Sequence, residues 1–166
     1  MNKQFLAVLP SIAADFFVST VSPTVNEFLS TERDIRRGRL SAIVLYHMAD
    51  YWNVENGGSR EKLTQLHKAL IDECPDFVLI RDVADATKHA ELRQQNAIPR
   101  TLSSSQQVTP AAPGLFEAPF GVGVFAEASK VMLKLDDGNW RNLAPAVRSV
   151  LAMWEKSIGP PKASFK

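Results

Sequence analysis

Residues 31–58 read TERDIRRGRLSAIVLYHMADYWNVENGG, and this stretch does more than any other to decide the fold. Thr31, followed three residues later by Asp34, has the form of a capping box and predicts a helix start. Gly57 and Gly58 predict its end. Between these signals, apolar residues recur at helical spacing and form one stripe: Ile35, Leu40, Ile43, Val44, Met48 and Trp52. The stretch therefore predicts a long helix that packs into a core.

The sequence before this helix predicts two more helical segments. An apolar stripe from Phe5 to Phe17 predicts a core helix. Ser22 before Pro23 resembles an N-cap with proline at the first helical position, which predicts a short helix through Leu29. We expect a break or kink between the two.

The sequence after residue 58 predicts three further helices, a long loop and a hairpin. The helices are expected over 59–74, from about 76 to 93, and from about 145 to 158. The Pro-, Ser- and Gly-rich stretch from about 95 to 128 has no helical period and predicts a long loop. Lys130 to Leu135 alternates as a half-buried strand does, and a return strand from Trp140 to Leu143 completes a hairpin.

These elements predict a mainly α protein, a bundle of about five helices with a C-terminal β-hairpin and a closing helix. A length of 166 residues favours a single helical domain over 1–158, followed by a frayed tail over 159–166.

Bulk composition argues against a disordered chain, a membrane-embedded chain and a chain with a strong long-range charge. The 45% hydrophobic and 22% charged residues are typical of a globular protein, and a net charge of +1 predicts no strong electrostatic field. A single cysteine, Cys74, allows no intramolecular disulfide, so we expect a cytoplasmic protein. No run approaches the roughly 18 apolar residues of a membrane span, and no membrane partner is expected.

The first candidate site lies on the predicted helix 76–93. Asp82, Asp85 and His89 are spaced so that they project from one face, with Arg81 and Lys88 beside them. Histidine is the side chain that titrates nearest to neutral pH, and a carboxylate one turn away can orient its ring. This pattern predicts an acid–base site.

The second candidate cluster consists of His47, Asp50 and Tyr51, with Arg36 and Arg39 two to three turns earlier. His47 and Asp50 interrupt an apolar stripe, and buried polar groups need partners. If the two helices are antiparallel neighbours, this pair meets Asp82, Asp85 and His89 in the bundle interior.

Three alternatives to an acid–base site stay open. The same charges are commonly helix-stabilising pairs, worth about 0.2–0.5 kcal/mol each. Two histidines and two aspartates can hold a metal, with His47, Asp50, Asp85 and His89 as its ligands, although the Glu-x-x-His spacing of helical di-iron sites is absent. A non-catalytic interaction module is the third, with an exposed apolar patch around Phe116, Phe120 and Phe125. We predict that His67 is a surface residue without a role.

Three blocks carry a resemblance to known proteins: YHMADYW at 46–52, RDVADATKH at 81–89 and LDDG at 135–138. With a tryptophan-bearing last helix, they resemble small bacterial proteins of uncharacterised function over most of the chain. More distantly, the chain resembles the HEPN superfamily, whose active members are metal-independent endoribonucleases that work as dimers. The family motif places four to six residues between its Arg and its His, and here seven residues separate Arg81 from His89, one more than that range allows.

The HEPN resemblance implies a function and roles for particular residues. His89 acts as general base or acid on a ribose 2′-hydroxyl, and Asp85 orients its ring. Arg81 and Lys88 hold the phosphate, with Arg93 and Arg100 as further phosphate contacts. The implied partners are RNA and a second copy of the chain, and the mechanism needs no metal or other cofactor.

Overall fold

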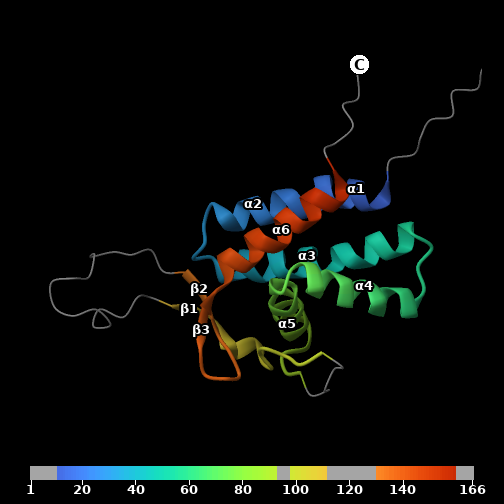
Figure 1. Ribbon diagram of the computed structural model, residues 1–166. Coiled ribbons are helices and arrows are strands. Elements are labelled where there is room, and N and C mark those ends of the chain that lie inside the picture. The colour runs from blue at the N-terminus through green and yellow to red at the C-terminus, as the bar shows by residue number, and fades with distance from the viewer. Residues whose placement is uncertain (1–10, 93–97, 112–129, 160–166) are drawn as a thin grey trace, which may run out of the picture.

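The computed structural model describes residues 11–92, 98–111 and 130–159. It is mainly α, with helices arranged around a central helix and a small antiparallel sheet at one end (Figure 1), which confirms the predicted fold class. The helices are α1 (Ile12–Phe16), η1 (Phe17–Val21), α2 (Ser22–Leu29), α3 (Ile35–Glu55), α4 (Arg60–Glu73), α5 (Asp76–His89), η2 (Ser105–Gln107) and α6 (Leu143–Ile158). The strands are β1 (Val108–Ala111), β2 (Lys130–Lys134) and β3 (Trp140–Asn142).

The first helical segment begins at Ser11, whose hydroxyl accepts a hydrogen bond from the Ala14 N–H. Of the break or kink predicted before Pro23, the break is wrong, because a π-helical turn, η1, joins α1 to α2 without interruption. Ser22 makes no capping hydrogen bond there, since the preceding backbone is already helical. Residues 1–10 lie outside the described part of the chain, and with them the first part of the predicted stripe; of its later members, Ala13 and Phe17 are buried in the core.

The long helix predicted from residues 31–58 is α3, and it contacts α1, α2, α4, α5 and α6. Its N-cap is Asp34, which accepts the Arg37 N–H at 3.0 Å, so the predicted capping box from Thr31 is wrong. A Cβ on Gly38 would lie 3.0 Å from Leu143 and 3.1 Å from Phe28. Glycine at this position therefore lets α2 and α6 approach α3 closely.

Helices α4 and α5 follow the predicted signals at their starts. Ser59 caps α4 by accepting the Lys62 N–H at 3.2 Å, and α5 begins after Pro75. Helix α5 packs against α3, but in Figure 1 it crosses α3 and α4, so α3 and α5 are neighbours that do not run antiparallel. Helix α5 ends at His89 rather than near residue 93, because Ala90 has a positive φ of 62°.

The sheet has three strands in the order β1-β2-β3, all antiparallel, where the sequence predicted a two-stranded hairpin. The added strand, β1, lies within the segment predicted as a loop. Val131 and Leu133 point into the core, as their alternation predicted. Helix α6 then begins at Leu143, two residues before Pro145, because the Asn142 side chain caps it.

The core is formed where α6 and α5 pack on α3. Trp154 is fully buried, and its indole N–H donates to the Leu45 carbonyl at 3.1 Å. The predicted patch around Phe116, Phe120 and Phe125 and the tail over 160–166 lie outside the described residues. Among the residues that the structure describes, no helix is long and apolar enough to cross a membrane.

Candidate functional site

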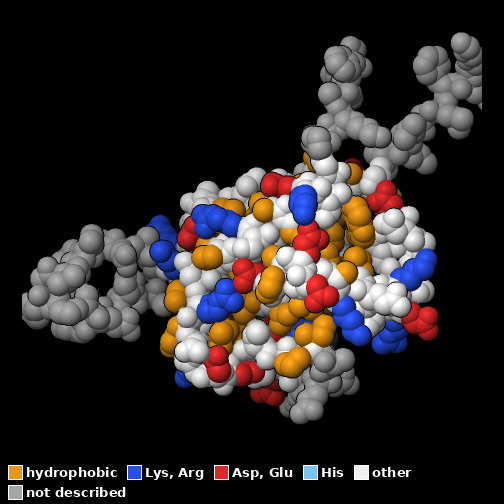
Figure 2. Space-filling model, in the orientation of Figure 1, with side chains coloured by type: hydrophobic (Ala, Val, Ile, Leu, Met, Phe, Trp, Pro, Cys, Tyr) orange, Lys and Arg blue, Asp and Glu red, His pale blue; other side chains and the backbone are white. Residues whose placement is uncertain are grey.

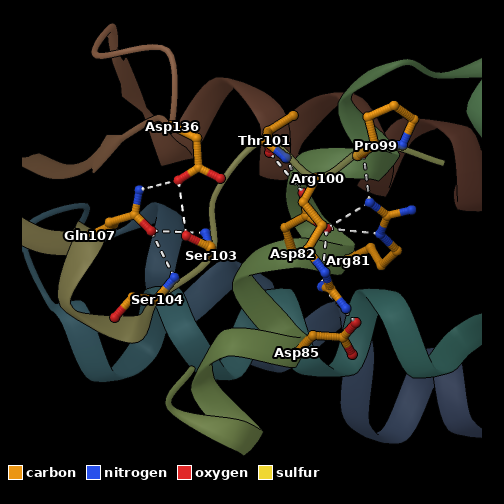
Figure 3. Close-up of polar contacts among 10 residues, drawn as sticks. All are labelled: Arg81, Asp82, Asp85, Pro99, Arg100, Thr101, Ser103, Ser104, Gln107 and Asp136. Carbon is orange, nitrogen blue, oxygen red and sulfur yellow. Dashed lines mark hydrogen bonds and ion pairs between the residues drawn. The ribbon is translucent and has the colours of Figure 1, made fainter. Parts of the chain in front are cut away.

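Arg81 and Asp82 form a buried ion pair at the centre of the first predicted cluster (Figure 3). Asp82 is fully buried and Arg81 is 5% exposed. The Arg81 guanidinium lies 2.7 Å from Asp82 Oδ1 through Nη2 and donates to it through Nε at 2.8 Å. Nη2 also donates to the Pro99 carbonyl at 3.1 Å. This guanidinium is therefore committed to contacts inside the protein.

The Asp82 carboxylate also binds the segment that follows α5. Its Oδ2 atom accepts the Thr101 N–H at 2.6 Å and the Thr101 hydroxyl at 2.9 Å. Arg100 lies 3.7 Å from Asp82 and 3.5 Å from Asp85, and so bridges the two carboxylates. Buried charges are stable only when paired and hydrogen-bonded. These contacts fix residues 99–101 against α5.

The structure does not gather the first predicted cluster into one accessible site. Arg81 is buried, and Asp85 is half-buried against Arg100. Lys88 and His89 are exposed at the C-terminal end of α5. His89 lies eight positions after Arg81 on the helix, which is roughly 12 Å along the axis. Arg93, the further predicted phosphate contact, lies outside the described residues.

The second predicted cluster contains a histidine–aspartate dyad. His47 Nδ1 lies 2.7 Å from Asp50 Oδ2, one helical turn along α3. Their side chains are 43% and 46% exposed, so they face solvent rather than the bundle interior that we considered. A carboxylate on Nδ1 fixes the tautomer and orientation of an imidazole and directs Nε2 outward for proton transfer. The dyad has the geometry of an oriented general base.

Aromatic rings extend the dyad toward α4 and α5. The Tyr46 ring lies 6.0 Å from that of His47, 5.3 Å from that of His67 and 6.0 Å from that of Phe77. The His67 and Phe77 rings are also 6.0 Å apart. We call the set Tyr46, His47, Asp50 and His67 the dyad cluster. It joins α3 to α4, and Phe77 connects it to α5.

His67 is half-buried in this cluster and contacts the Tyr46 ring, so the prediction that it is a surface residue is wrong. It stands four residues after Leu63 and three before Leu70, on the same side of α4. That spacing is the signal that places His67 on the inner face.

Burial dominates the titration of the two inner members of the cluster. Burial, reinforced by the negative charge of Asp85, raises the pKa of Tyr46 to about 12. Burial also lowers the pKa of His67, although the nearby Asp50 carboxylate opposes this shift. At neutral pH, Tyr46 therefore keeps its proton and His67 is a neutral imidazole.

The remaining members of the second cluster lie apart from the dyad or serve the fold. Tyr51 stacks on Phe16 of α1 with ring centroids 3.8 Å apart. Arg39 donates to the Ser105 carbonyl at 2.8 Å and so fastens η2 to α3. Arg36 is exposed near the start of α3.

The metal hypothesis fails on geometry. In the described part of the chain, no three His, Cys, Asp or Glu side chains are placed so that they could hold a metal ion. The four proposed ligands, His47, Asp50, Asp85 and His89, all lie within that part.

No protein-family model, curated protein or solved structure matches this chain. The resemblance to uncharacterised bacterial proteins and to the HEPN superfamily therefore stays a prediction, and function has to be argued from the site itself.

Proposed function

We propose that this protein processes RNA at a metal-independent acid–base site in which His47 is the general base and Asp50 is its orienting partner. One observation carries the proposal, the 2.7 Å contact between Nδ1 of a solvent-accessible histidine and a carboxylate. The choice of RNA as substrate rests on the resemblance of the helical chain to the HEPN superfamily.

The reaction requires two proton transfers and no redox step. His47 Nε2 takes the proton from a ribose 2′-hydroxyl, and the 2′-oxygen attacks the adjacent phosphorus. The bond from phosphorus to the 5′-oxygen breaks, and that oxygen takes up a proton from water while the His47 imidazolium returns its proton to the solvent. The products are a 2′,3′-cyclic phosphate and a free 5′-hydroxyl. Tyr46, which keeps its proton at neutral pH, can supply a hydrogen bond to the substrate beside His47.

The proposal places the base on His47 rather than on His89, the residue that the resemblance implied. His89 is the exposed last residue of α5, and no hydrogen bond to its ring occurs among the described residues. His47 has a carboxylate that sets its tautomer. Lys88 stays a candidate phosphate contact because its ammonium is exposed and lies outside the Arg81–Asp82 network.

The test is cleavage of a fluorescently labelled single-stranded RNA by the full chain in the presence of EDTA. We expect His47→Gln to lower the rate by roughly 10²- to 10⁴-fold, the usual contribution of a general acid or base. His89→Gln is the matched control and should retain activity. A substrate with a 2′-deoxyribose at the scissile position should stay intact. If activity survives in His47→Gln but is lost in His89→Gln, the general base is His89 on α5 and not His47. A wild-type chain that does not cleave RNA would contradict the proposal.

A second candidate function, self-association, is favoured by an exposed apolar patch of Ile12, Tyr51 and Val54. These side chains are 47%, 39% and 63% exposed. Ile12 belongs to α1, and Tyr51 and Val54 belong to α3. Glu55, the last residue of α3, joins the two helices by accepting hydrogen bonds from the Ser11 hydroxyl and the Ala13 N–H. We propose that a second copy of the chain covers this patch. Light scattering should then give a dimer mass that Val54→Lys reduces to that of a monomer, and a monomeric wild-type chain would exclude it.

A further inference from the structure

The three-stranded sheet has one face packed on helices and one face open to solvent. Val108, Val131 and Leu133 are buried against the helical core. Because side chains alternate along a strand, Lys130 and Lys134 project from the opposite face of β2. Both lysines are exposed. The open face therefore consists of the outward positions of the three strands.

An exposed tryptophan shares this face with the lysines. Trp140 on β3 pairs in register with Lys134, so the two side chains lie on the same side of the sheet. Trp140 is 53% exposed, although an indole is among the side chains that gain most from burial. Nothing in the described part of the chain buries this ring.

The strands themselves are positively charged. They read VTPA, KVMLK and WRN, which include three cations and no acid. Arg141 is paired with Asp76 at 2.9 Å, which leaves the two lysines on the open face. Figure 2 shows Lys and Arg side chains at the end of the molecule where the sheet lies.

Among the residues that the structure describes, the acids nearest in sequence to the two lysines are in the turn between β2 and β3, and both have hydrogen-bonding partners. Asp136 accepts from the Ser103 hydroxyl at 3.1 Å and from the Gln107 amide at 2.8 Å. Asp137 accepts from the backbone and side chain of Asn139. Neither carboxylate forms an ion pair with Lys130 or Lys134 in the described structure.

We propose that the open face of the sheet binds single-stranded RNA, with one base stacked on Trp140 and the phosphate backbone following Lys134 and Lys130. Lys130 and Lys134 form no ion pair with another described residue, and an exposed aromatic ring beside exposed cations is the combination that single-strand binders use. The inference rests on the proposed function for its choice of RNA over DNA. It adds a substrate-binding surface formed by the sheet, separate from the dyad cluster on α3 and α4.

The geometry favours a single strand over a duplex. Lys130 and Lys134 are four residues apart along β2, or roughly 13 Å. This separation lets them contact different phosphates of one strand. A base can stack on Trp140 only if it is unstacked from its neighbour, and bases within a duplex are not available in this way.

Binding is measured with a probe that the proposed reaction cannot cleave, a fluorescein-labelled twelve-nucleotide 2′-O-methyl-uridylate. Fluorescence anisotropy gives its Kd for the full chain, and tryptophan emission reports on the protein in the same titration. We expect Trp140→Ala to weaken binding by about fivefold or more and to remove most of the emission change. Lys130→Glu with Lys134→Glu should weaken binding and lower the slope of log Kd against log salt by roughly 1.4.

Arg60→Glu is the matched charge reversal, because Arg60 is exposed at the start of α4, far along the chain from the sheet. Its binding should change little, and circular dichroism should show that every variant is folded. Equal affinity for the hybridised duplex would overturn the single-strand inference, and binding of polyglutamate with equal affinity would show a surface for acidic proteins instead. Wild-type affinity for the probe in both Trp140→Ala and the double lysine variant would overturn the proposed RNA-binding surface.

The same variants separate this inference from the proposed function. If His47→Gln binds the probe normally and Trp140→Ala does not, the sheet surface stands whether or not the chain cleaves RNA. If Trp140→Ala cleaves RNA at the wild-type rate at low substrate concentration, the proposed acid–base site is supported and the proposed RNA-binding surface on the sheet is contradicted.

Discussion

Asp82 on α5 accepts both the backbone N–H and the hydroxyl of Thr101, at 2.6 and 2.9 Å, while its other carboxylate oxygen holds the buried Arg81 guanidinium. One fully buried side chain thus joins a helix to a segment nineteen residues further along the chain. Because these contacts occupy Asp82 and Arg81, the two residues stabilise the fold, although their sequence pattern suggested a catalytic site.

Asp82→Asn should destabilise the protein strongly. The variant keeps the size of the side chain but leaves the buried Arg81 charge without its partner, a change that typically costs about 3–5 kcal/mol. Thr101→Val is the control, because it removes only the hydroxyl hydrogen bond and should cost roughly 1 kcal/mol. Urea unfolding followed by circular dichroism measures both. Similar losses in the two variants would show that the ion pair is not what stabilises this junction.

Gln107→Ala should loosen the segment between α5 and the sheet. The Gln107 Oε1 atom accepts the Ser103 and Ser104 N–H groups at 2.8 and 2.7 Å (Figure 3). The Gln107 side-chain amide also donates to the Lys134 carbonyl at 2.8 Å. Without this side chain, the two serine amides lose their acceptors, so their hydrogen exchange should accelerate while exchange in α3 stays slow.

Gln106→Ala serves as the comparison for this prediction. Gln106 is exposed, and only its backbone N–H is hydrogen-bonded among the described contacts. Protected Ser103 and Ser104 amides in Gln107→Ala would mean that other contacts order the segment.

Local signals predicted the parts of the fold that depend on neighbours in sequence. Ser59 caps α4 and Pro75 precedes α5 as expected, because a cap acts within one turn of its own helix. Strand β1 escaped prediction because Pro110 and the preceding serines resemble a loop, and its partner in β2 is about twenty residues away. Pairing at that distance leaves no local pattern.

The candidate site was predicted by composition but not by role. Asp82, Asp85 and His89 do lie on one helix, α5, as their spacing predicted. Spacing on a helix, however, does not show which positions are covered by other elements. Asp82 follows Leu79 by three residues and precedes Ala86 by four, and both of those are buried. The same apolar flanks that mark His67 on α4 therefore also mark Asp82 as an inward position.

His67 should make the stability of the protein depend on pH in the acidic range. Burial holds the pKa of His67 below its ordinary value of 6.5, so the folded state disfavours the protonated ring. The contribution of neutral His67 is thus complete above pH 6.5 and is lost as pH falls below 6.5 through the folded pKa. Arg81 reinforces the shift, while Asp50 and Asp85 oppose it.

The measurement for this prediction is the melting temperature of the wild type and of His67→Gln between pH 7.5 and 5. The wild type should lose more stability over this range than His67→Gln, which has no proton to bind at that position. His89→Gln should follow the wild type, because His89 is exposed. Parallel curves for the wild type and His67→Gln would contradict the assigned pKa direction.

Asp50→Asn should lower the turnover of RNA only while His47 is present. In the proposed reaction, Asp50 orients the His47 imidazole, whose Nδ1 lies 2.7 Å from Asp50 Oδ2, so its effect must pass through His47. We expect Asp50→Asn alone to reduce kcat with little change in KM, because the tautomer of His47 is no longer fixed by a carboxylate. In the His47→Gln background, the same change should cost almost nothing further, since residues that act as a unit are not additive. If Asp50→Asn lowers kcat equally in both backgrounds, Asp50 acts on the fold or on the substrate independently, and the dyad is not the catalytic unit.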